Sequence, residues 1–378
     1  MARLATLFDG HLDLAWNATA FGRDQTLTLQ ELRQRERELP RDGRETPTVS
    51  LPALRSGHVA VFQGTLFARA QPSTPPGRML LRVDTDHPSQ AIAHAAAVAQ
   101  LAYYQLLARQ GDLRLIADAA TLEAHWSAWE RGNGTRPGCI LMIEGADPVT
   151  EPDEIRWWHE RGVRAVSLAH AGISAYATGN GTPPGAGGLT MAGRVLLERM
   201  AELGMALDLS HLSDASFAEA IERYEGPVFA SHTNCRQLAP GDRQFNDAQL
   251  RLIGHRDGVV GVALHNAMLS RQWQSQPGRR EAVGLSNVAE HIDHICQRIG
   301  DARHAAIGSD LDGGFGVESV PHDVDSIADL PRLAEHLSKR GFKDADIRAV
   351  LHGNWLDFWR HVFAPAEEAT TDQDPPLL

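Results

Sequence analysis

The feature that most constrains the fold of this chain is a series of eight short apolar runs bounded by Gly, Pro or polar residues. They lie near residues 4–13, 58–64, 139–144, 163–170, 205–211, 227–232, 258–265 and 304–310. Most are separated by segments with helical periodicity, such as 189–204, 213–224, 246–256 and 286–300. Strands that alternate with helices form parallel sheets, and runs as apolar as CILMI and GVVGVAL indicate burial on both faces.

Eight such strands are the number that a closed barrel requires. We therefore predict an α/β fold, a (β/α)8 TIM barrel that occupies residues 1–363 as a single domain, followed by a disordered tail over 364–378. An open doubly wound sheet is the alternative, but it normally carries a glycine-rich phosphate loop after its first strand. The first run here continues as FDGHLDLAWN, without a G-x-G-x-x-G motif.

The helix boundaries and the long connections can also be predicted. Plausible N-caps are Thr190, Ser213, Asn246 and Ser286, and Gly204 and Gly300 stand where helices would end. Long insertions follow the first two strands: 14–57 holds the candidate helix LTLQELRQRERELP, and 65–138 holds PSTPPG and helical stretches at 88–110 and 119–130. The Gly- and Pro-rich segment 171–188 is expected to be a loop, either over the site or on the surface.

Charge and cysteine content limit the partners. The 378 residues include 36 basic and 48 acidic side chains, a net charge of -12, which argues against nucleic acid or an anionic membrane as partner. No apolar stretch of about 18 residues suggests a membrane span. The N-terminus lacks the pattern of a signal peptide, and three widely spaced cysteines predict no disulfide framework. We expect a cytoplasmic enzyme with a small-molecule substrate.

Four of the apolar runs end on side chains that bind metals. These residues are His11, Asp13, Glu144, His211 and His232. One such residue alone is more often a capping or core polar group, but five on four strand ends would share one rim of a barrel and predict a metal site. Five ligands exceed the three of a catalytic zinc, so two divalent ions fit better, bridged by Glu144 and a shared hydroxide that would hydrolyse an amide. Nitrogen and carboxylate ligands without thiolate favour Zn²⁺, with Mn²⁺, Co²⁺ or Fe²⁺ possible.

Other strand ends carry candidates for catalysis. A neutral His170 could hydrogen-bond the carbonyl oxygen as it becomes an oxyanion, and Asp310 could transfer the proton to the leaving amine, although Asp312 could do so instead. After the sixth run, either Arg236 or Arg243 could bind a substrate carboxylate.

Taken together, the motifs DGHLDL, VAVFQG, IEGADP, GVRAVSLAH, LDLSHLS, PVFASHTN, RQFND, IGSDLDG and HGNWLDFW resemble the membrane (renal) dipeptidase family of zinc metallopeptidases, in the amidohydrolase superfamily. The resemblance covers roughly residues 7–362. It implies a binuclear zinc barrel that hydrolyses dipeptides, often with a D-residue at the C-terminal position, and it suggests a homodimer.

The resemblance also assigns roles. It makes His11 and Asp13 ligands of the first ion, Glu144 the bridge, and His211 and His232 ligands of the second. It gives His170 the polarisation of the substrate, Arg243 the terminal carboxylate and Asp310 the proton transfer. His265 stands where relatives often carry a tyrosine that helps to bind the carboxylate, so we expect it in the substrate site.

We therefore predict a binuclear metallo-dipeptidase and keep two alternatives. A related amidohydrolase could act on N-acyl amino acids or on other small amides and lactams. Enzymes that bridge their ions with a carbamylated lysine are disfavoured, because the chain has only Lys339 and Lys343. A metal-binding barrel without catalysis would lack a ligand or a proton shuttle, and none of the expected groups is missing.

Overall fold

Eight parallel strands form a nearly closed barrel in the computed structural model, which describes residues 5–39, 44–71, 85–132, 136–183 and 185–364. The strands are β1 (Leu7–Leu12), β2 (Val59–Phe67), β6 (Gly138–Glu144), β7 (Val163–Ser167), β8 (Ala206–Asp208), β9 (Val228–Phe229), β10 (Val260–Val262) and β11 (Ala305–Ile307). Neighbours pair in parallel in the order β10-β11-β1-β2-β6-β7-β8-β9. A parallel bridge between Ala230 and Val260 joins the two ends of this order. The predicted barrel is confirmed.

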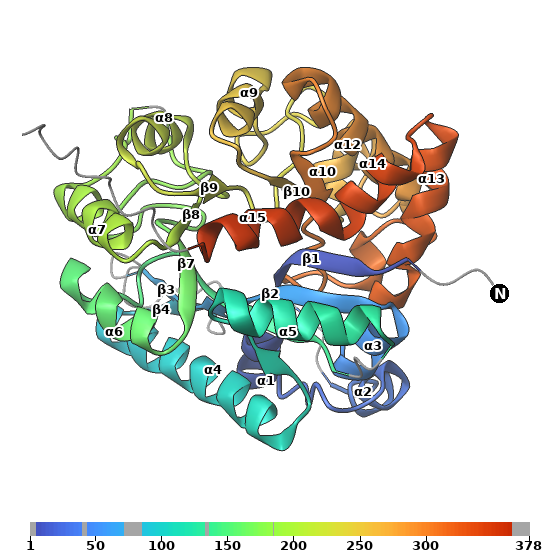
Figure 1. Cartoon of the computed structure of the whole chain (residues 1–378), viewed down its shortest axis with the longest axis horizontal. Coiled ribbons are helices and arrows are strands. Elements are labelled where there is room, and N and C mark those ends of the chain that lie inside the picture. The colour runs from blue at the N-terminus through green and yellow to red at the C-terminus, as the bar shows by residue number, and fades with distance from the viewer. Residues whose placement is uncertain (1–4, 40–43, 72–84, 133–135, 184, 365–378) are drawn as a thin grey trace, which may run out of the picture.

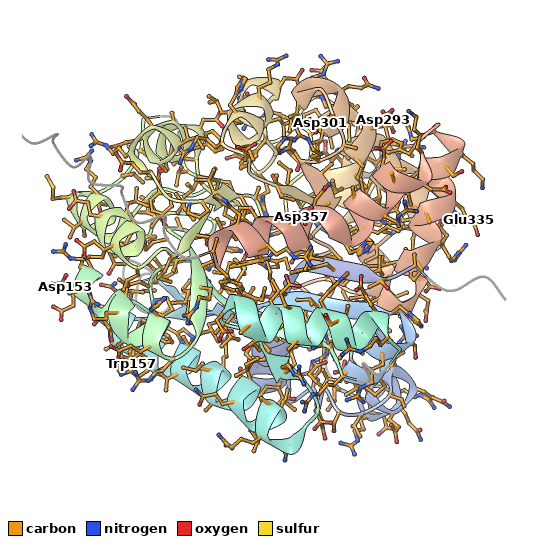
Figure 2. All side chains as sticks on the ribbon, in the orientation of Figure 1. Asp153, Trp157, Asp293, Asp301, Glu335 and Asp357 are labelled. Atoms are coloured by element: carbon orange, nitrogen blue, oxygen red, sulfur yellow. The ribbon has the colours of Figure 1, made fainter. Side chains whose placement is uncertain are left out.

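Helices surround the barrel, as Figure 1 shows. Those that follow the middle and late strands are α6 (Ile155–Glu160), α7 (Met191–Glu202), α8 (Asp214–Arg223), α9 (Asp247–His255), α10 (Asn266–Leu269), α11 (Arg271–Ser275), α12 (Leu285–Ile299), α13 (Leu333–Lys339), α14 (Asp344–Arg348) and α15 (Asn354–Val362). Salt bridges connect the outer layer, such as Arg199 to Asp153 (2.6 Å) and Arg340 to Asp293 (3.0 Å); both aspartates are labelled in Figure 2.

Most of the predicted helix boundaries are confirmed. Thr190, Ser213 and Asn246 are the N-caps of α7, α8 and α9. The predicted N-cap Ser286 is wrong, because α12 begins one residue earlier, at Leu285. The backbone N–H of Leu285 donates to the distant carboxylate of Asp323 (2.9 Å), a cap that the local sequence does not reveal.

Both long insertions contain the expected helices. The first holds α1 (Leu14–Phe21), α2 (Leu29–Arg35) and α3 (Leu51–Ser56). The second holds the strands β3 (Arg69–Ala70), β4 (Asp86–His87) and β5 (Arg114–Leu115), with α4 (Gln90–Gln110) and α5 (Ala119–Glu130). The PSTPPG segment and the predicted tail beyond residue 364 lie outside the described residues.

Helix α4 is long and apolar enough to cross a membrane by length and composition. It packs here on α1 and β2, and the side-chain amide of Gln100 accepts from and donates to the backbone of Phe67 (2.7 Å each). Because a buried amide with both bonds made ties this helix to a barrel strand, α4 is part of the core layer.

The last helix covers the amino-terminal end of the barrel, where it crosses the front of the molecule in Figure 1. The indole of Trp355 on α15 is buried and donates to the carbonyl of Ile307 (2.8 Å). A side-chain carbon at Gly10 in β1 would lie 2.5 Å from that indole, so only glycine leaves room for it. This end is therefore filled, and functional side chains must gather at the opposite end.

Candidate metal centre

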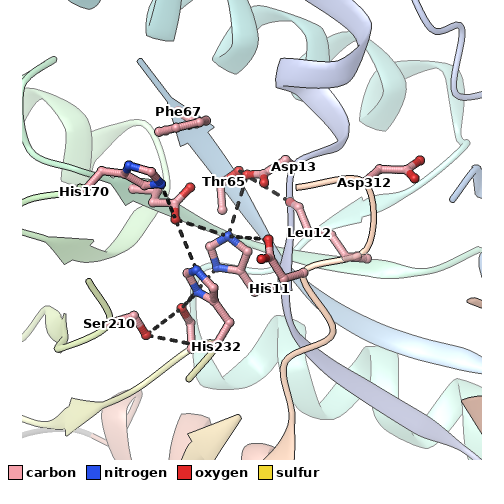
Figure 3. A network of polar contacts seen from close by, with 12 residues as sticks. His11, Leu12, Asp13, Thr65, Phe67, His170, Ser210, His232 and Asp312 are labelled. Carbon is pink, nitrogen blue, oxygen red and sulfur yellow. Dashed lines mark hydrogen bonds and ion pairs between the residues drawn. The ribbon is translucent and has the colours of Figure 1, made fainter. Parts of the chain in front are cut away.

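The five predicted ligands meet at the carboxyl end of the barrel, and all are buried. The Oε1 atom of Glu144 lies 3.6 Å from Nε2 of His11, 3.3 Å from Nε2 of His211 and 3.4 Å from Nε2 of His232. The Nε2 atom of His11 is 3.7 Å from Oδ1 of Asp13 (Figure 3). These atoms form two groups able to hold a cation, one with His11 and Asp13 and one with His211 and His232, and both include Glu144.

The ligands reach this point in two ways. His11 and Glu144 lie within β1 and β6, whereas β8 and β9 stop before His211 and His232, so the strands predicted over 205–211 and 227–232 are too long. His211 has a left-handed backbone with φ of 67°. Non-glycine residues rarely adopt this conformation, which costs about 1–2 kcal/mol. The turn therefore gives up local stability to direct an imidazole into the cluster.

A carboxylate and a hydroxyl behind the cluster set the tautomers of two histidines. The Ser231 hydroxyl donates to Oδ2 of Asp208 (2.6 Å), which uses its single proton. The Oγ atom of Ser231 also lies 2.8 Å from Nδ1 of His232 and 3.1 Å from Nδ1 of His11. Because its own proton is already donated to Asp208, both rings must donate their Nδ1–H to this oxygen. Although Asp208 lies close enough to His11 and His232 to form a third metal-binding group, its oxygens are already bonded to Ser231 and Ser210. We therefore assign Asp208 to the orientation of His11 and His232, through Ser231, and not to metal binding.

The third histidine is oriented by the Gly- and Pro-rich loop. Nδ1 of His211 lies 2.9 Å from the side-chain oxygen of Asn180, and the backbone N–H of Asn180 donates to the carbonyl of His211 (2.7 Å). An amide oxygen only accepts, so Nδ1 of His211 carries the proton. The loop 171–188 thus borders the site and fixes one of its ligands.

With Nδ1 engaged in this way, the Nε2 atoms of all three rings face the same space. Burial, reinforced by Arg243, lowers the pKa of His211 to about 3, and burial together with His11 lowers the pKa of His232. Both are neutral at neutral pH, the state that binds metals. Within the described parts of the chain, Nε2 of His11 is buried without a hydrogen-bond partner.

The charge of the cluster also fits a cation. Burial alone would lower the pKa of His11, but the carboxylates of Glu144 and Asp13 outweigh it and raise that pKa to about 10. Burial and Glu144 raise the pKa of Asp13 to about 7. In the metal-free protein, the protons bound to His11 and Asp13 therefore offset the repulsion between the buried carboxylates. A divalent cation could replace them, because binding releases protons from its ligands.

A cavity of about 390 Å³ opens above the cluster. Its lining includes Asp13, Glu45, Phe67, Glu144, His170, Asn180, His211, His232, Arg243, His265, Met268, Asp310, Phe315 and Ser319. One larger hollow, of about 570 Å³ beside α2, shares Glu45 with this cavity but includes none of the five ligands. The cavity has room for a small molecule with several polar groups.

His170 borders this cavity as a neutral ring. Burial, His211 and Arg69 lower its pKa well below the ordinary value. Its Nδ1 lies 3.3 Å from Nη1 of Arg69, and because a guanidinium only donates, the proton of the ring is on Nε2. That Nε2 is 4.0 Å from Oε1 of Glu144, so an N–H donor faces the cluster.

The two candidate arginines differ in position. Arg243 lines the cavity, where its guanidinium donates to the carbonyl of His232 (2.6 Å) and to the hydroxyl of Thr233 (3.4 Å). Arg236 lies outside the cavity lining in a salt bridge with Asp214 (2.7 Å). Only Arg243 can therefore meet a molecule in the cavity.

The two candidate aspartates are separated in the same way. Asp310 lines the cavity, with Oδ1 3.9 Å from Nε2 of His11, and burial raises its pKa well above the ordinary value. Asp312 accepts from the backbone N–H groups of Thr48 and Val49 (2.8 and 3.1 Å) and lies outside the lining. Its carboxylate points away from the cluster in Figure 3. Asp312 fastens the first insertion to the barrel.

His265 also borders the cavity. Its ring stacks on Phe315 with 4.5 Å between centroids, and burial, with a contribution from Arg243, lowers its pKa to about 4. A flat, neutral ring therefore lies beside the Arg243 guanidinium.

Sequence reasoning missed Asp208, Ser231 and Asn180, which orient the ligands, and Arg69, which orients His170. One signal was available, since both ALDLSH and PVFASH end in Ser-His and the second of these serines is the shared acceptor. Asn180 and Arg69 had no such signal, because they come from a loop and from a two-residue strand.

Comparison with known proteins gives consistent matches. The sequence profile of the family described as membrane dipeptidase (peptidase family M19) matches residues 1–373. An uncharacterized Klebsiella pneumoniae protein from the pqqA 5' region is 31% identical over 267 residues, 68% of this chain and 93% of that protein. Dipeptidase aclJ of Aspergillus oryzae is 32% identical over 58% of this chain, and dipeptidase 3 of Mus musculus is 29% identical over 72%. These matches span 50% and 54% of the two dipeptidases.

Solved structures share the fold. The crystal structure of dipeptidase AC, a metallo peptidase of family M19, has a TM-score of 0.74 at 24% identity, over 96% of this chain and 100% of that one. A metallo peptidase from Rhodobacter sphaeroides, liganded with a phosphinate mimic of L-Ala-D-Ala, has a TM-score of 0.73 at 22% identity, over 94% and 99%.

Proposed function

This chain belongs to the membrane dipeptidase family, the metallo-dipeptidases of peptidase family M19, and we propose that it hydrolyses the peptide bond of dipeptides with two divalent metal ions, most readily zinc. The observation that carries the proposal is the pair of buried ligand groups that share Glu144. His11 and Asp13 would hold one ion, and His211 and His232 the other. When bound, such ions would supply a Lewis acid for the peptide carbonyl and a water of lowered pKa.

The side chains of the cavity support the remaining tasks. Arg243 uses two of its five N–H donors within the protein and can offer others to the substrate's terminal carboxylate. His170 can donate its Nε2–H to the scissile carbonyl oxygen as negative charge develops there. Asp310, whose pKa burial raises, can accept a proton and deliver it to the amine that leaves.

A D-residue at the C-terminal position is the finer part of the proposal. Its support is the phosphinate mimic of L-Ala-D-Ala bound to the Rhodobacter sphaeroides peptidase, which shares this fold.

The first test measures metal content and substrate range together. Protein loaded with zinc or manganese should contain about two ions per chain and should release amino acids from a panel of L-L and L-D dipeptides. Cleavage of N-acyl amino acids without cleavage of dipeptides would instead indicate a related amidohydrolase. A loaded protein that is inert toward both panels would contradict any hydrolytic role.

Matched aspartate variants test the proton transfer. Asp310→Asn should lower kcat about 10²–10⁴-fold while metal content is unchanged, because general acid–base catalysis contributes that much. Asp312→Asn should instead lower Tm and keep most of kcat, because that carboxylate bonds backbone away from the cavity. The assignment fails if the two variants exchange these effects.

A further inference from the structure

One carboxylate in the cavity has no part in the chemistry proposed so far. Asp13 and Glu144 belong to the metal-binding groups, and Asp310 is assigned to proton transfer. Glu45 also lines the cavity. It comes from the first insertion, whereas the other three come from the ends of barrel strands.

The carboxylate of Glu45 is held in place by neutral donors. Its oxygens accept from the backbone N–H of Gly316 (2.6 Å) and from the hydroxyl of Ser319 (2.9 Å). These bonds leave further lone pairs on both oxygens, because a carboxylate offers about four acceptor positions. The side chain is thus oriented at the cavity wall and can still accept.

The negative charge of Glu45 has no counter-ion among the described residues. The Arg23 guanidinium contacts Glu45 at its backbone carbonyl (2.6 Å) and not at its carboxylate. The salt bridges of Arg23 are with Glu36 (2.8 Å) and Asp312 (3.6 Å). Arg44 donates to the carbonyl of Phe21 (3.0 Å). An oriented carboxylate without a counter-ion at a cavity wall is complementary to a cation.

The position of Glu45 relative to Arg243 indicates which kind of cationic group Glu45 could bind. Arg243, His265, Phe315 and Glu45 follow the consecutive strands β9, β10, β11 and β1 around the rim. In this order the residues of the stacked pair, His265 and Phe315, come between Arg243 and Glu45 on the rim of the cavity. A substrate bound by its carboxylate at Arg243 could extend a methylene chain across these rings, which suits the stem of a long basic side chain.

We propose that Glu45 is a specificity-determining residue that binds the protonated side chain of a lysine- or arginine-type residue, so that the preferred substrates are dipeptides with a basic side chain. This inference rests on the proposed function and names its substrate class.

The experiment compares lysine with norleucine, which has the same carbon chain and no charge. Values of kcat/KM are measured for Ala-Lys against Ala-norleucine and for Lys-Ala against norleucine-Ala. We expect one pair to show a preference of about tenfold for lysine, the size of one charge-assisted hydrogen bond. The pair that shows it identifies the residue whose side chain reaches Glu45. Added salt should reduce the preference, because the carboxylate is partly exposed.

Variants assign the preference to Glu45. Glu45→Gln keeps one oxygen to accept from Gly316 and gains an N–H that can donate to the Ser319 hydroxyl, but it removes the charge. The ratio of lysine to norleucine should therefore fall to about one. Glu318→Gln is the matched control. Glu318 bonds Thr46 (2.7 and 2.9 Å) across the same two segments and is not in the cavity lining, so this variant should keep the ratio.

Three results would overturn the inference: equal rates for both members of both pairs, a ratio unchanged in Glu45→Gln, or an equal loss on all substrates in that variant. Calorimetric titration of the wild-type protein with the same peptides reads the preference without turnover. Tighter binding of the lysine peptide without hydrolysis would support the inference and contradict the proposed function. Hydrolysis of both peptides at equal rates would support the proposed function and contradict the inference.

Discussion

At the scale of single residues, the candidate site depends on groups that contact the ligands from behind. Ser231 and Asp208 direct the Nε2 atoms of His11 and His232 into the cluster. Partners of this kind typically contribute 10–100-fold to metal affinity because they fix both the tautomer and the orientation of the ring. Their importance can be measured one ligand at a time.

Asn180 offers the cleanest such measurement. Asn180→Ala should weaken metal binding about tenfold, because His211 loses the acceptor that keeps its proton on Nδ1. Competition with a chromogenic chelator gives the dissociation constant directly. Asn180→Asp retains an acceptor and should bind nearly as well as the wild type. Thr182→Ala, which removes a bond within the same loop, should have no effect. Equal affinities in all four proteins would show that the loop does not orient the ligand.

Arg69 should affect turnover rather than metal content. Its guanidinium keeps Nδ1 of His170 an acceptor, so Arg69→Met should allow the wrong tautomer and lower kcat about tenfold while metal content is unchanged. Arg69→Lys restores a donor and should recover part of the loss. A variant that loses metal, or that keeps full kcat, would contradict this role.

The residues that sequence could and could not supply differ in how they reach the site. His11, Asp13, Glu144, His211 and His232 end apolar runs, and strand ends share one rim, so the pattern alone brought them together. Asn180 and Arg69 act through contacts across the fold, and no local pattern encodes such a contact. The same reasoning separates Asp310 from Asp312, two residues apart yet directed to different surroundings.

At the scale of elements, the positions of all eight strands were predictable from apolar runs, whereas their ends were not. The run that includes β8 continues to His211, but the strand ends at Asp208, and His211 lies in a left-handed turn. The start of α12 was missed for a comparable reason, since its cap comes from Asp323. The hydrophobic pattern determines which segments are buried. Contacts across the fold determine where each strand or helix begins and ends.

The docking of α12 makes a prediction about pH. His291 is buried on α12, where Nδ1 accepts from the backbone N–H of Cys235 (3.0 Å) and burial lowers its pKa to about 4. In the unfolded chain this histidine takes up a proton near pH 6.5. Its contribution to stability is therefore complete above pH 6.5 and is lost as pH falls toward 4, by about 1.4 kcal/mol per pH unit.

Urea unfolding of metal-free protein at pH 7 and pH 5 measures this dependence. His291→Asn removes the titrating ring and should lower the difference in unfolding free energy between the two pH values, even though the variant is less stable at both. An unchanged difference would mean that His291 remains able to protonate in the folded protein.

At the scale of the whole molecule, metal ions should stabilise the fold. They would bind the folded cluster and neutralise its buried carboxylates, so a concentration 100 times the dissociation constant adds about 2.7 kcal/mol. We expect zinc or manganese to raise Tm by several degrees and excess chelator to reverse the shift. Glu144→Gln should abolish it, whereas Glu45→Gln, in the same cavity but outside both metal groups, should retain it. A shift that survives Glu144→Gln would place the ions elsewhere.

The contact between Trp355 and Gly10 has a consequence for how the chain is made. It joins the first strand to the last described helix, so the amino-terminal end of the barrel cannot close until nearly all of the sequence has been synthesised. At roughly 5–20 residues per second, β1 waits on the order of tens of seconds for its final partner. During that time the newly made strands expose apolar surface on the ribosome. Expression of this protein should therefore depend more on chaperone supply and translation speed than its folded stability alone would suggest.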